Sequence, residues 1–394
     1  MTTVGTGPRS QLRAWLGVAA ITASLFVFVT TELMPVGLLT PVSAGLSISV
    51  GVAGMMVTLY GISAGVGVPF LVAWSRTVNR RVLLATLLAI MAAGNLVTAV
   101  SPNFPIVLAA RLVTGFAHGV FWAIGVAMAM RLVPGEKVGK AAAVVLSGMS
   151  IATVVGMPLG TFLESLTDWR TTFLIWSGLS LAVLLAVVLT LPSLPSQSAI
   201  PVREVFALPM RNRRLRAVMS TVALYVLGHF GAYTFIRPFI EQRTGASAAW
   251  VTGLLIVFGI GGAVGNFVAG HTVARNTRTT FVAACAGLVA SLSLLLLFGD
   301  SPAGLAIAVV VWGVSFGAAN LCQVNMMLAA APDTFEAAMS LNTMGYNIAI
   351  ALGALLGGVF AGGFGTVGAV WLGVALTVTA LLTALGSHRD TTRT

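Results

Sequence analysis

Charged side chains are scarce in this 394-residue chain. Asp, Glu, Lys and Arg together make up 8% of the residues, whereas apolar residues make up 58%. The hydrophilic gaps between apolar stretches reach at most about 25 residues, too few for a soluble domain. This composition excludes an ordinary soluble protein and predicts one that is embedded in a lipid bilayer.

Cysteine is nearly absent as well. Cys285 and Cys322 are the two in the sequence, and both fall inside apolar stretches. Neither a disulfide framework nor a metal cluster is therefore predicted. The run GEKVGKA at 135–141 has the wrong spacing for a phosphate-binding loop and lacks its Ser or Thr, which disfavours ATP hydrolysis. Because no nucleophile or nucleotide site can be assigned, we predict no enzyme, no cofactor and no bound metal.

The chain is rich in apolar stretches of about twenty residues, the length that a helix needs to cross about 30 Å of hydrocarbon. A helix is suited to the bilayer because its backbone groups are satisfied internally. We divide the sequence into twelve such stretches, at 14–40, 50–73, 82–100, 104–130, 141–163, 171–191, 217–240, 249–270, 280–299, 303–330, 338–362 and 367–386. The pattern predicts an all-α integral membrane protein with twelve transmembrane helices.

The basic residues are distributed unevenly about these stretches. Most of the 21 Lys and Arg lie at the two ends of the chain and in every second gap, including Arg80, Arg81 and the run 211–216. The net charge of +11 is therefore a sign of topology rather than of nucleic-acid binding. Because basic loops stay in the cytoplasm, both termini and these gaps are predicted to be cytoplasmic.

A segment rich in Pro, Ser and Arg divides the chain into two halves. An equal number of apolar stretches lies on each side of it, which lets the halves share one orientation, as parallel repeats do. Met34-Pro35-Val36 in the first stretch is echoed by Arg237-Pro238-Phe239 in the seventh. We predict an N-terminal six-helix bundle at 1–191, a cytoplasmic linker at 192–216, and a C-terminal six-helix bundle with a short tail at 217–394.

Two formal charges fall well inside predicted helices. At 1.5 Å per residue, Glu32 lies about 12 Å from the outer end of the first helix and Arg111 about 10 Å from that of the fourth, so they share one depth. A charge at this depth is costly unless it is paired or faces water. One interpretation is a static ion pair that fixes helix register. The other is a proton-coupling site, because burial and a neighbouring Arg act on the proton affinity of a carboxyl group in opposite directions.

A set of polar and aromatic side chains lies at middle depth in both halves. Amides, imidazoles and aromatic rings can hydrogen-bond and stack on a neutral polar ligand such as a sugar, or hold an amphipathic drug. For any single member, hydrogen bonding or packing between helices is an equally good interpretation. The set predicted to line a substrate cavity is His118, Trp122, His229, Tyr233, Asn320, Gln323 and Asn347.

Several segments resemble one known family. They are TTELMPVGLL at 30–39, RRVLL at 80–84, RLVTGFAHGVFW at 111–122, SGMSIATVVGMPLG at 147–160 and DWRTTF at 168–173. Over its whole length the chain is similar to the major facilitator superfamily, within its twelve-helix drug:proton antiporter branch, and most closely to bacterial sugar-efflux transporters of the arabinose-efflux-permease type. The resemblance implies two bundles that rock about a central cavity in the bacterial inner membrane.

The resemblance also implies roles for individual residues. Arg111 matches a motif that the family associates with proton transfer, and Glu32 matches the acidic residue of the first helix. Small residues and a Pro in the fifth helix match the motif that marks antiporters, where they allow close packing and bending between the halves. These residues are Gly148, Gly156, Pro158 and Gly160.

The chain departs from the family pattern in the gap between the second and third helices. Val72, Arg76 and Asn79 stand where the family usually has Gly, Asp and Gly. Of the cytoplasmic loop motif only Arg80 and Arg81 are kept, so the usual Asp-based latch is not expected here.

The predicted function is a proton-coupled antiporter that exports a small molecule, a sugar or a drug-like compound, by alternating access. Its partners are the substrate, protons and the bilayer, with no nucleic acid, and we expect it to act as a monomer. Arg237 stands where close sugar-efflux relatives are expected to carry an acidic residue. The assignment of a sugar as the substrate is therefore less secure than the assignment of the fold. Export of an endogenous metabolite is an alternative, and a channel or a membrane-embedded enzyme would be a different class.

Overall fold

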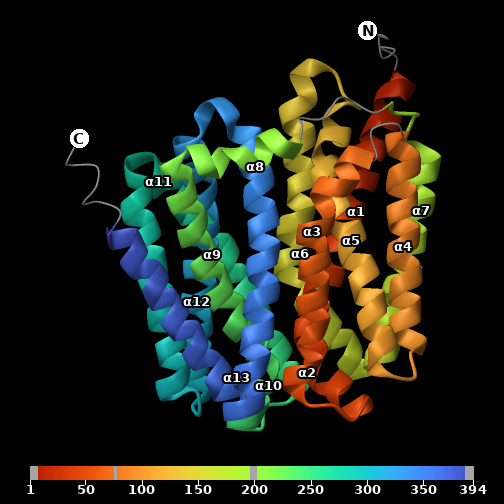
Figure 1. Ribbon diagram of the computed structural model, residues 1–394. Helices are drawn as coiled ribbons and strands as arrows, with labels where there is room; N and C mark the ends of the chain where they lie inside the picture. The colour runs from red at the N-terminus through yellow and green to blue at the C-terminus, as the bar shows by residue number, and fades with distance from the viewer. Residues whose placement is uncertain (1–7, 75–77, 196–201, 387–394) are drawn as a thin grey trace.

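The structure, a computed structural model, describes residues 8–74, 78–195 and 202–386. Within these ranges every regular element is a helix. The long helices run side by side in two bundles, the warm-coloured one from the first half of the chain and the green-to-blue one from the second (Figure 1). The all-α membrane fold predicted from the sequence is confirmed.

The first bundle contains α1 (Pro8–Gly45), α2 (Val50–Ala53), α3 (Met55–Trp74), α4 (Arg80–Val100), α5 (Phe104–Met130), α6 (Val138–Leu166) and α7 (Trp169–Thr190). Helix α8 (Val202–Arg211) connects the bundles. The second bundle contains α9 (Arg213–Tyr233), α10 (Ile236–Thr244), α11 (Ala248–Phe298), α12 (Pro302–Ala330) and α13 (Phe335–Gly386). The short 3-10 helices η2 (Gly135–Lys137) and η3 (Pro332–Thr334) precede α6 and α13.

Nine of the described helices are long and apolar enough to cross a membrane. Two of them, α11 and α13, have 51 and 52 residues, and a straight helix of that length would measure about 75 Å, more than twice the hydrocarbon thickness. Each is two crossings that meet at a non-helical residue, Asn276 in α11 and Gly365 (φ +71°) in α13. Both residues lie in predicted gaps. Counting these pairs and the apolar α3, the described residues make the twelve predicted crossings.

One predicted helix is divided. The sequence predicts a single helix at 217–240, but α9 ends at Tyr233 and α10 begins at Ile236. Pro238 has no N–H to donate to the carbonyl of Thr234, so a continuous helix would lose a hydrogen bond at this point. The interruption places Arg237 in the first turn of α10.

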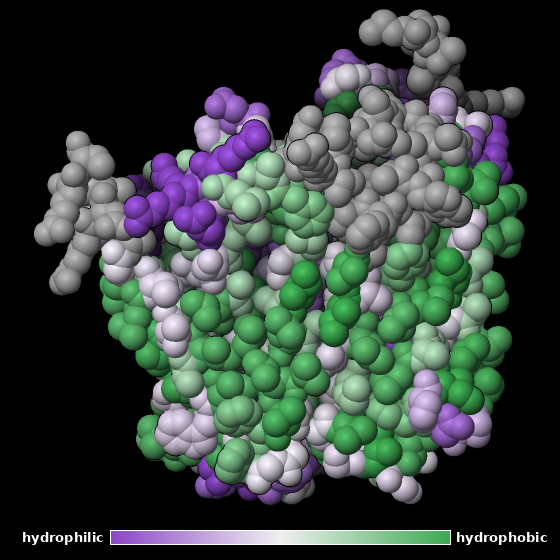
Figure 2. Space-filling view, viewed as in Figure 1, coloured by the Kyte–Doolittle hydropathy of each residue, from purple (hydrophilic) through white to green (hydrophobic). Residues whose placement is uncertain are grey.

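The surface agrees with a protein that crosses a bilayer. Figure 2 shows a broad hydrophobic band around the middle of the molecule and hydrophilic residues gathered toward its two ends. Large apolar side chains such as Leu185, Phe267 and Trp371 are more than half exposed. Acyl chains of a bilayer would cover this area, which in water would be an aggregation hazard.

The two ends of the molecule differ. Helix α1 begins and α13 ends at the same end, which also carries α8, whereas α2 and α10 lie at the opposite end (Figure 1). We call the first the termini end and the second the far end.

Candidate functional site

One face of α6 points toward the second bundle and changes from exposed to buried along the helix. Positions 147, 150, 154, 157 and 161 share this face, because they are spaced by three or four residues. Near the far end Met157 and Thr161 are 2% and 0% exposed, whereas Ser147 and Ser150, nearer the termini end, are exposed. The first bundle therefore contacts the second from the far end to about the middle of α6, where a Cβ atom at Gly259 would lie 2.6 Å from Cα of Val154.

The facing side of α11 changes in the same way. Thr252 and Leu255 are buried, whereas Asn266, about four turns nearer the termini end, is exposed. The hydroxyl oxygens of Thr161 and Thr252 lie 2.8 Å apart and join the helices near the far end. Asn266 and Ser150 are therefore not covered by the other bundle, and the two helices separate toward the termini end.

A second seam between the bundles, α2 and α3 with α13, is closely packed. A Cβ atom at Gly61 would lie 2.9 Å from the carbonyl oxygen of Asn347, and one at Gly51 would lie 2.5 Å from that of Gly358. Backbones approach this closely only where side chains are absent. This seam extends from the far end to middle depth and holds the bundles together while the α6–α11 seam diverges.

An ionic cluster centred on Arg237 closes the far end. Arg237 is 4% exposed, and its Nη1 donates to Glu164 Oε2 of α6 at 2.8 Å and to the Gly37 carbonyl of α1 at 2.6 Å. Its Nε donates to Glu241 Oε1 at 2.7 Å, and Glu241 Oε2 accepts a hydrogen bond from the Thr40 hydroxyl of α1 at 2.6 Å. We call Arg237, Glu164, Glu241 and Thr40 the far-end cluster. It joins α10 of the second bundle to both α1 and α6 of the first.

Sequence reasoning missed most of this cluster. From sequence, Arg237 is singled out as part of a repeat and as a departure from the family pattern, but with no partner, while Glu164 and Glu241 lie next to the ends of predicted helices, where a charge is ordinary. Pairing across the bundles is the signal that identifies the cluster, and only the tertiary structure shows it.

Glu32 borders the space between the bundles. It lies one turn of α1 from Val36, which packs into the core of the second bundle, and its side chain is 12% exposed. Its Oε2 lies 3.3 Å from Nε2 of His118 on α5, a side chain that is 1% exposed. Along α1, Glu32 is about 7 Å from Gly37 and thus on the termini side of the far-end cluster. The carboxyl group therefore sits where the seam begins to open.

Arg111 makes no direct ion pair with Glu32 in the structure. Its Nη1 donates to the Thr31 carbonyl at 2.8 Å, and the guanidinium lies 4.9 Å and 5.6 Å from the ring centroids of Phe173 and Tyr60. Its Nε and Nη2 are buried without a hydrogen-bond partner.

The depth calculation failed because α1 is longer than expected. It continues to Gly45, five residues past the predicted end, which places Glu32 about 20 Å from the end of its helix. That distance is close to the roughly 21 Å between His118 and the start of α5, while the long Arg111 side chain still reaches the Thr31 carbonyl, next to Glu32. The expected depth of Glu32 thus depended on where α1 ends, which the sequence did not show.

The second bundle contributes a hydrogen-bonded cluster centred on Asn320 of α12. Its Oδ1 accepts from the hydroxyls of Tyr225 and Tyr346 at 3.2 Å and 3.1 Å, and from Gln323 Nε2 at 3.2 Å. These side chains come from α9, α12 and α13. Asn320 is partly exposed, and Gln323 Oε1 is buried without a partner. The cluster fixes an amide at the middle of the bundle and leaves it hydrogen-bonding capacity.

His229 is fully buried among aromatic rings. Its Nδ1 accepts a hydrogen bond from Trp312 Nε1 at 2.9 Å, and its ring stacks on Phe316 with 3.6 Å between centroids. Tyr233, 6% exposed, stacks on it at 4.9 Å. Neither His229 nor Tyr233 therefore presents much surface to the space between the bundles in this structure.

The remaining predicted cavity residues lie in both bundles. Trp122 is half-buried beside His118, with ring centroids 6.2 Å apart. Asn347 is 5% exposed, and its Nδ2 donates to the Thr343 carbonyl at 2.9 Å, while its Oδ1 has no partner. The structure thus places six of the seven predicted residues in three groups, beside Glu32, around Asn320 and around His229, and places Asn347 in the seam between α3 and α13.

The antiporter-motif residues of α6 pack within the first bundle, not between the halves as expected. A Cβ atom at Gly148, Gly156 or Gly160 would meet Thr22, Thr30 or Met34 of α1 at 2.7 Å, 2.8 Å or 2.6 Å. The physical reason is the spacing of four residues, which keeps these glycines on one stripe. The face that meets α11 lies on another side of α6. Pro158 is buried on this helix as well.

We expect the Gly156→Ala variant to unfold more readily than the wild type, by about 1–3 kcal/mol, because the added methyl group overfills the contact with Thr30. Gly139→Ala in the same helix is the control, since no atom lies within 4 Å of a Cβ there, and it should be neutral or stabilising. Thermal unfolding of both purified variants measures the difference. Equal melting temperatures would contradict the assignment of Gly156 to close packing.

The loop-motif residues act within the first bundle in the structure. Asn79 caps α4 by accepting from Arg81 N at 3.0 Å and also accepts from Leu194 N, while Arg80 N donates to the Leu194 carbonyl at 2.8 Å. The Arg81 guanidinium donates to the Val188 carbonyl. These contacts fasten the start of α4 to the end of α7. Position 76 and the side chain at position 72 lie outside the described residues.

The segment DWRTTF also has a structural role. Asp168 caps α7, and hydrogen bonds from the backbone N–H and hydroxyl of Thr171 hold the pKa of Asp168 below its usual value. Nη1 of Arg170 donates to the carbonyls of Ala99 and Ser101 at 2.9 Å and 2.6 Å, which ties α7 to the end of α4.

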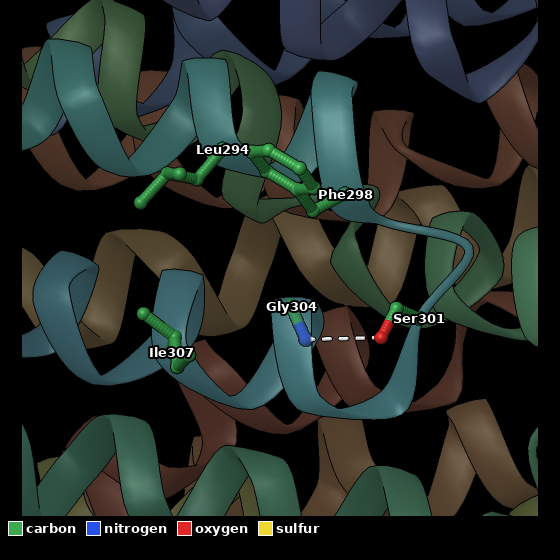
Figure 3. Close-up of a pocket in the computed structure, with 5 residues that line it drawn as sticks. All are labelled: Leu294, Phe298, Ser301, Gly304 and Ile307. Carbon is green, nitrogen blue, oxygen red and sulfur yellow. Dashed lines mark hydrogen bonds between the residues drawn. The ribbon is translucent and has the colours of Figure 1, made fainter.

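A separate shallow pocket lies on the second bundle. Figure 3 shows it between α11 and α12, lined by Leu294, Phe298, Ser301, Gly304 and Ile307. Its one side-chain hydroxyl is already engaged, because Ser301 Oγ accepts from Gly304 N at 3.4 Å. With an apolar lining and no charged group, this pocket does not belong to the candidate site.

Two helical bundles that meet at one end and diverge at the other define a membrane transporter rather than an enzyme. The chain belongs to the Major Facilitator Superfamily, whose family model matches residues 16–335.

Solved structures with a similar fold include the nucleoside transporter NupG (TM-score 0.75, 15% identity, covering 94% of this chain and 98% of that chain). The human organic anion transporter MFSD10 (TETRAN) has a TM-score of 0.63 at 15% identity, covering 96% and 100%. A bacterial homolog of the human lysosomal transporter Spinster, in an inward-facing and unoccupied conformation, has a TM-score of 0.69 at 14% identity, covering 97% and 96%. At such low identity these similarities show the fold alone.

Proposed function

We propose that this protein is a proton-coupled antiporter that exports a small molecule by alternating access. The observation that carries the proposal is the seam between α6 and α11, which is buried at the far end and exposed toward the termini end. A transporter of this kind opens a central site to one side at a time, by rocking one bundle against the other. The contacts described above correspond to one of those two states.

The termini end is proposed to face the cytoplasm of a bacterial cell. Basic residues at this end outnumber those at the far end, and basic loops remain on the cytoplasmic side. They include Arg131, Lys137, Lys140, Arg211, Arg213, Arg214, Arg216, Arg275 and Arg278. In this orientation, the separation of α6 and α11 toward the termini end would expose the seam to the cytoplasm, from which cargo for export is taken up.

Glu32 is the proposed proton carrier. It lies on the termini side of the far-end cluster, beside the seam, and its Oε2 is 3.3 Å from Nε2 of His118. Arg111 is close by at the Thr31 carbonyl and has two unpartnered nitrogen atoms, so it can stabilise the carboxylate once the proton has left. Protonation in one state and release in the other would couple proton entry to substrate exit.

The Asn320 cluster is the proposed substrate contact in the second bundle. We expect Asn320→Leu to weaken transport of polar substrates by roughly ten- to a hundredfold, because three donors lose their acceptor and the ligand loses an amide. Thr379→Val serves as the control, because that hydroxyl donates to the Ala375 carbonyl on the exposed side of α13. Initial rates over a range of substrate concentrations separate affinity from turnover. An unchanged substrate profile would remove Asn320 from the site.

The direct test of the function uses the whole protein in proteoliposomes. A panel of labelled sugars, drug-like compounds and metabolites is loaded, and flux is measured with an imposed proton gradient and again after a protonophore collapses it. Antiport is supported if at least one compound moves saturably in the direction opposite to the proton flow and this movement is lost when the gradient collapses. Non-saturable flux that ignores the gradient would indicate a channel, and flux of no compound would contradict the proposal.

A further inference from the structure

The junction between α8 and α9 combines exposed apolar and basic side chains at the termini end. Helix α8 lies across the tops of the long helices instead of along them (Figure 1). Four arginines occupy the end of α8 and the first turn of α9: Arg211, Arg213, Arg214 and Arg216. We call these residues, together with Phe206 and Met210, the basic junction.

The basic junction is fastened to the second bundle. Leu208 packs against the core of that bundle, and Leu215 is 0% exposed. Between them, Asn212 Nδ2 donates to the Ala330 carbonyl at the end of α12 at 2.7 Å, and its Oδ1 accepts from Leu215 N at 2.9 Å. The segment thus presents its surface in a fixed orientation.

The outward side of α8 is apolar. Phe206 and Met210 are 42% and 82% exposed, and their spacing of four residues places them on one face of the helix. Leu208 lies on the opposite face, toward the core. A helix with one apolar face turned away from its protein is typical of a helix lying in the membrane interface.

The arginines surround this apolar face with positive charge. All four are exposed, and none of Arg211, Arg214 and Arg216 takes part in an ion pair among the described side chains. Arg216 Nη1 donates only to the Pro209 carbonyl, at 3.4 Å. The adjoining η3 carries one acidic residue, Asp333. By sequence, α8 also contains Glu204 and the first turn of α13 contains Glu336, so the four arginines of the junction still outnumber the acidic residues of these elements.

We propose that the basic junction binds the phosphate groups of anionic phospholipids in the leaflet at the termini end. Phe206 and Met210 would enter the acyl region while the arginines reach the phosphates, the arrangement that basic amphipathic helices adopt at membranes. An acidic protein or a nucleic acid would use the charges but leave the apolar face uncovered. A lipid satisfies both, and α8 lies across the ends of the long helices, where a bilayer surface would be expected.

Binding of this kind has a consequence for the fold. Helix α8 ends the segment of chain that connects the two bundles, and it is anchored to the second bundle. Anionic lipids would hold that bundle at a set depth while the first moves. The inference does not depend on the direction or the cargo of transport.

The test is native mass spectrometry of the full chain, titrated with phosphatidylglycerol and with phosphatidylcholine. The wild type should retain phosphatidylglycerol preferentially. The Arg211→Gln/Arg214→Gln/Arg216→Gln variant should lose that preference, by roughly fivefold for each arginine. Arg275→Gln, another exposed arginine at the termini end, is the matched control and should keep it.

Two further experiments distinguish a lipid headgroup from free phosphate as the ligand and measure the contribution of the apolar side chains. Inorganic phosphate at millimolar concentration should displace no bound lipid. The Phe206→Ser/Met210→Ser variant should weaken the binding of phosphatidylglycerol and of phosphatidylcholine to the same extent. Thermal melting confirms that each variant is folded. The proposal is overturned if the triple variant keeps its preference, if Arg275→Gln loses it equally, or if inorganic phosphate competes.

Discussion

Replacing Glu32 with Gln is expected to abolish transport that is driven by a proton gradient, while the protein stays folded and still binds substrate. Glutamine has nearly the same shape and can face His118, but it cannot release a proton. Groups that transfer a proton contribute roughly 10²–10⁴-fold to the steps they serve, so the rate should fall by at least about a hundredfold. Flux into proteoliposomes at several external pH values measures the effect.

The control for this experiment is Glu136→Gln. Glu136 is an exposed carboxylate in η2 at the termini end, and its loss removes the same charge outside the seam. Substrate binding without a gradient should be similar in both variants. Undiminished pH-dependent transport by Glu32→Gln would exclude this residue from proton coupling and favour the static interpretation of its burial.

Replacing Arg237 with Gln is expected to open the far end. The substitution leaves Glu164 and Glu241 facing each other without their shared cation and removes the contact with the Gly37 carbonyl. Loss of one partner from a buried ion pair costs about 3–5 kcal/mol, and that cost falls on the state in which the bundles meet at the far end. The population of the far-end-open state should then rise by a factor of about 100 or more.

Thiol labelling reports this shift. In a chain with Cys285 and Cys322 replaced by Ser, Thr252→Cys should react slowly with an impermeant maleimide added at the far side, because Thr252 is 8% exposed. Adding Arg237→Gln should accelerate the reaction, and adding Glu164→Gln to that variant should restore part of the protection. Equal labelling rates with and without Arg237 would show that the far-end cluster does not hold the seam.

Arg243→Gln supplies the comparison for the cluster. Arg243 also lies on α10 and pairs with Asp300 at 3.3 Å, but Asp300 is 67% exposed. An exposed pair of this kind contributes little to stability. Its loss should leave the labelling rate within about twofold of the wild type, since the pair does not connect the two bundles.

The sequence by itself determined the membrane fold. Apolar length, helix-compatible composition and the alternation of basic gaps are properties of consecutive residues, and the bilayer imposes the same length on every crossing. These properties located the breaks at Asn276 and Gly365, although both helices continue almost without interruption. They did not locate the break before α10, because Pro238 is a single residue within an otherwise apolar stretch.

The tertiary structure decided which charges meet. From sequence, Glu32 was matched to Arg111 by depth, but in the structure the Glu32 carboxyl lies against His118, and Arg111 bonds the neighbouring Thr31 carbonyl instead. Arg237 stood out only as a departure, yet it joins three helices from two bundles. The physical reason is that depth along a helix follows from counting residues, whereas contact between helices also depends on where each helix ends, on its rotation and on which neighbours it packs against. Those quantities come from the packing of the whole chain.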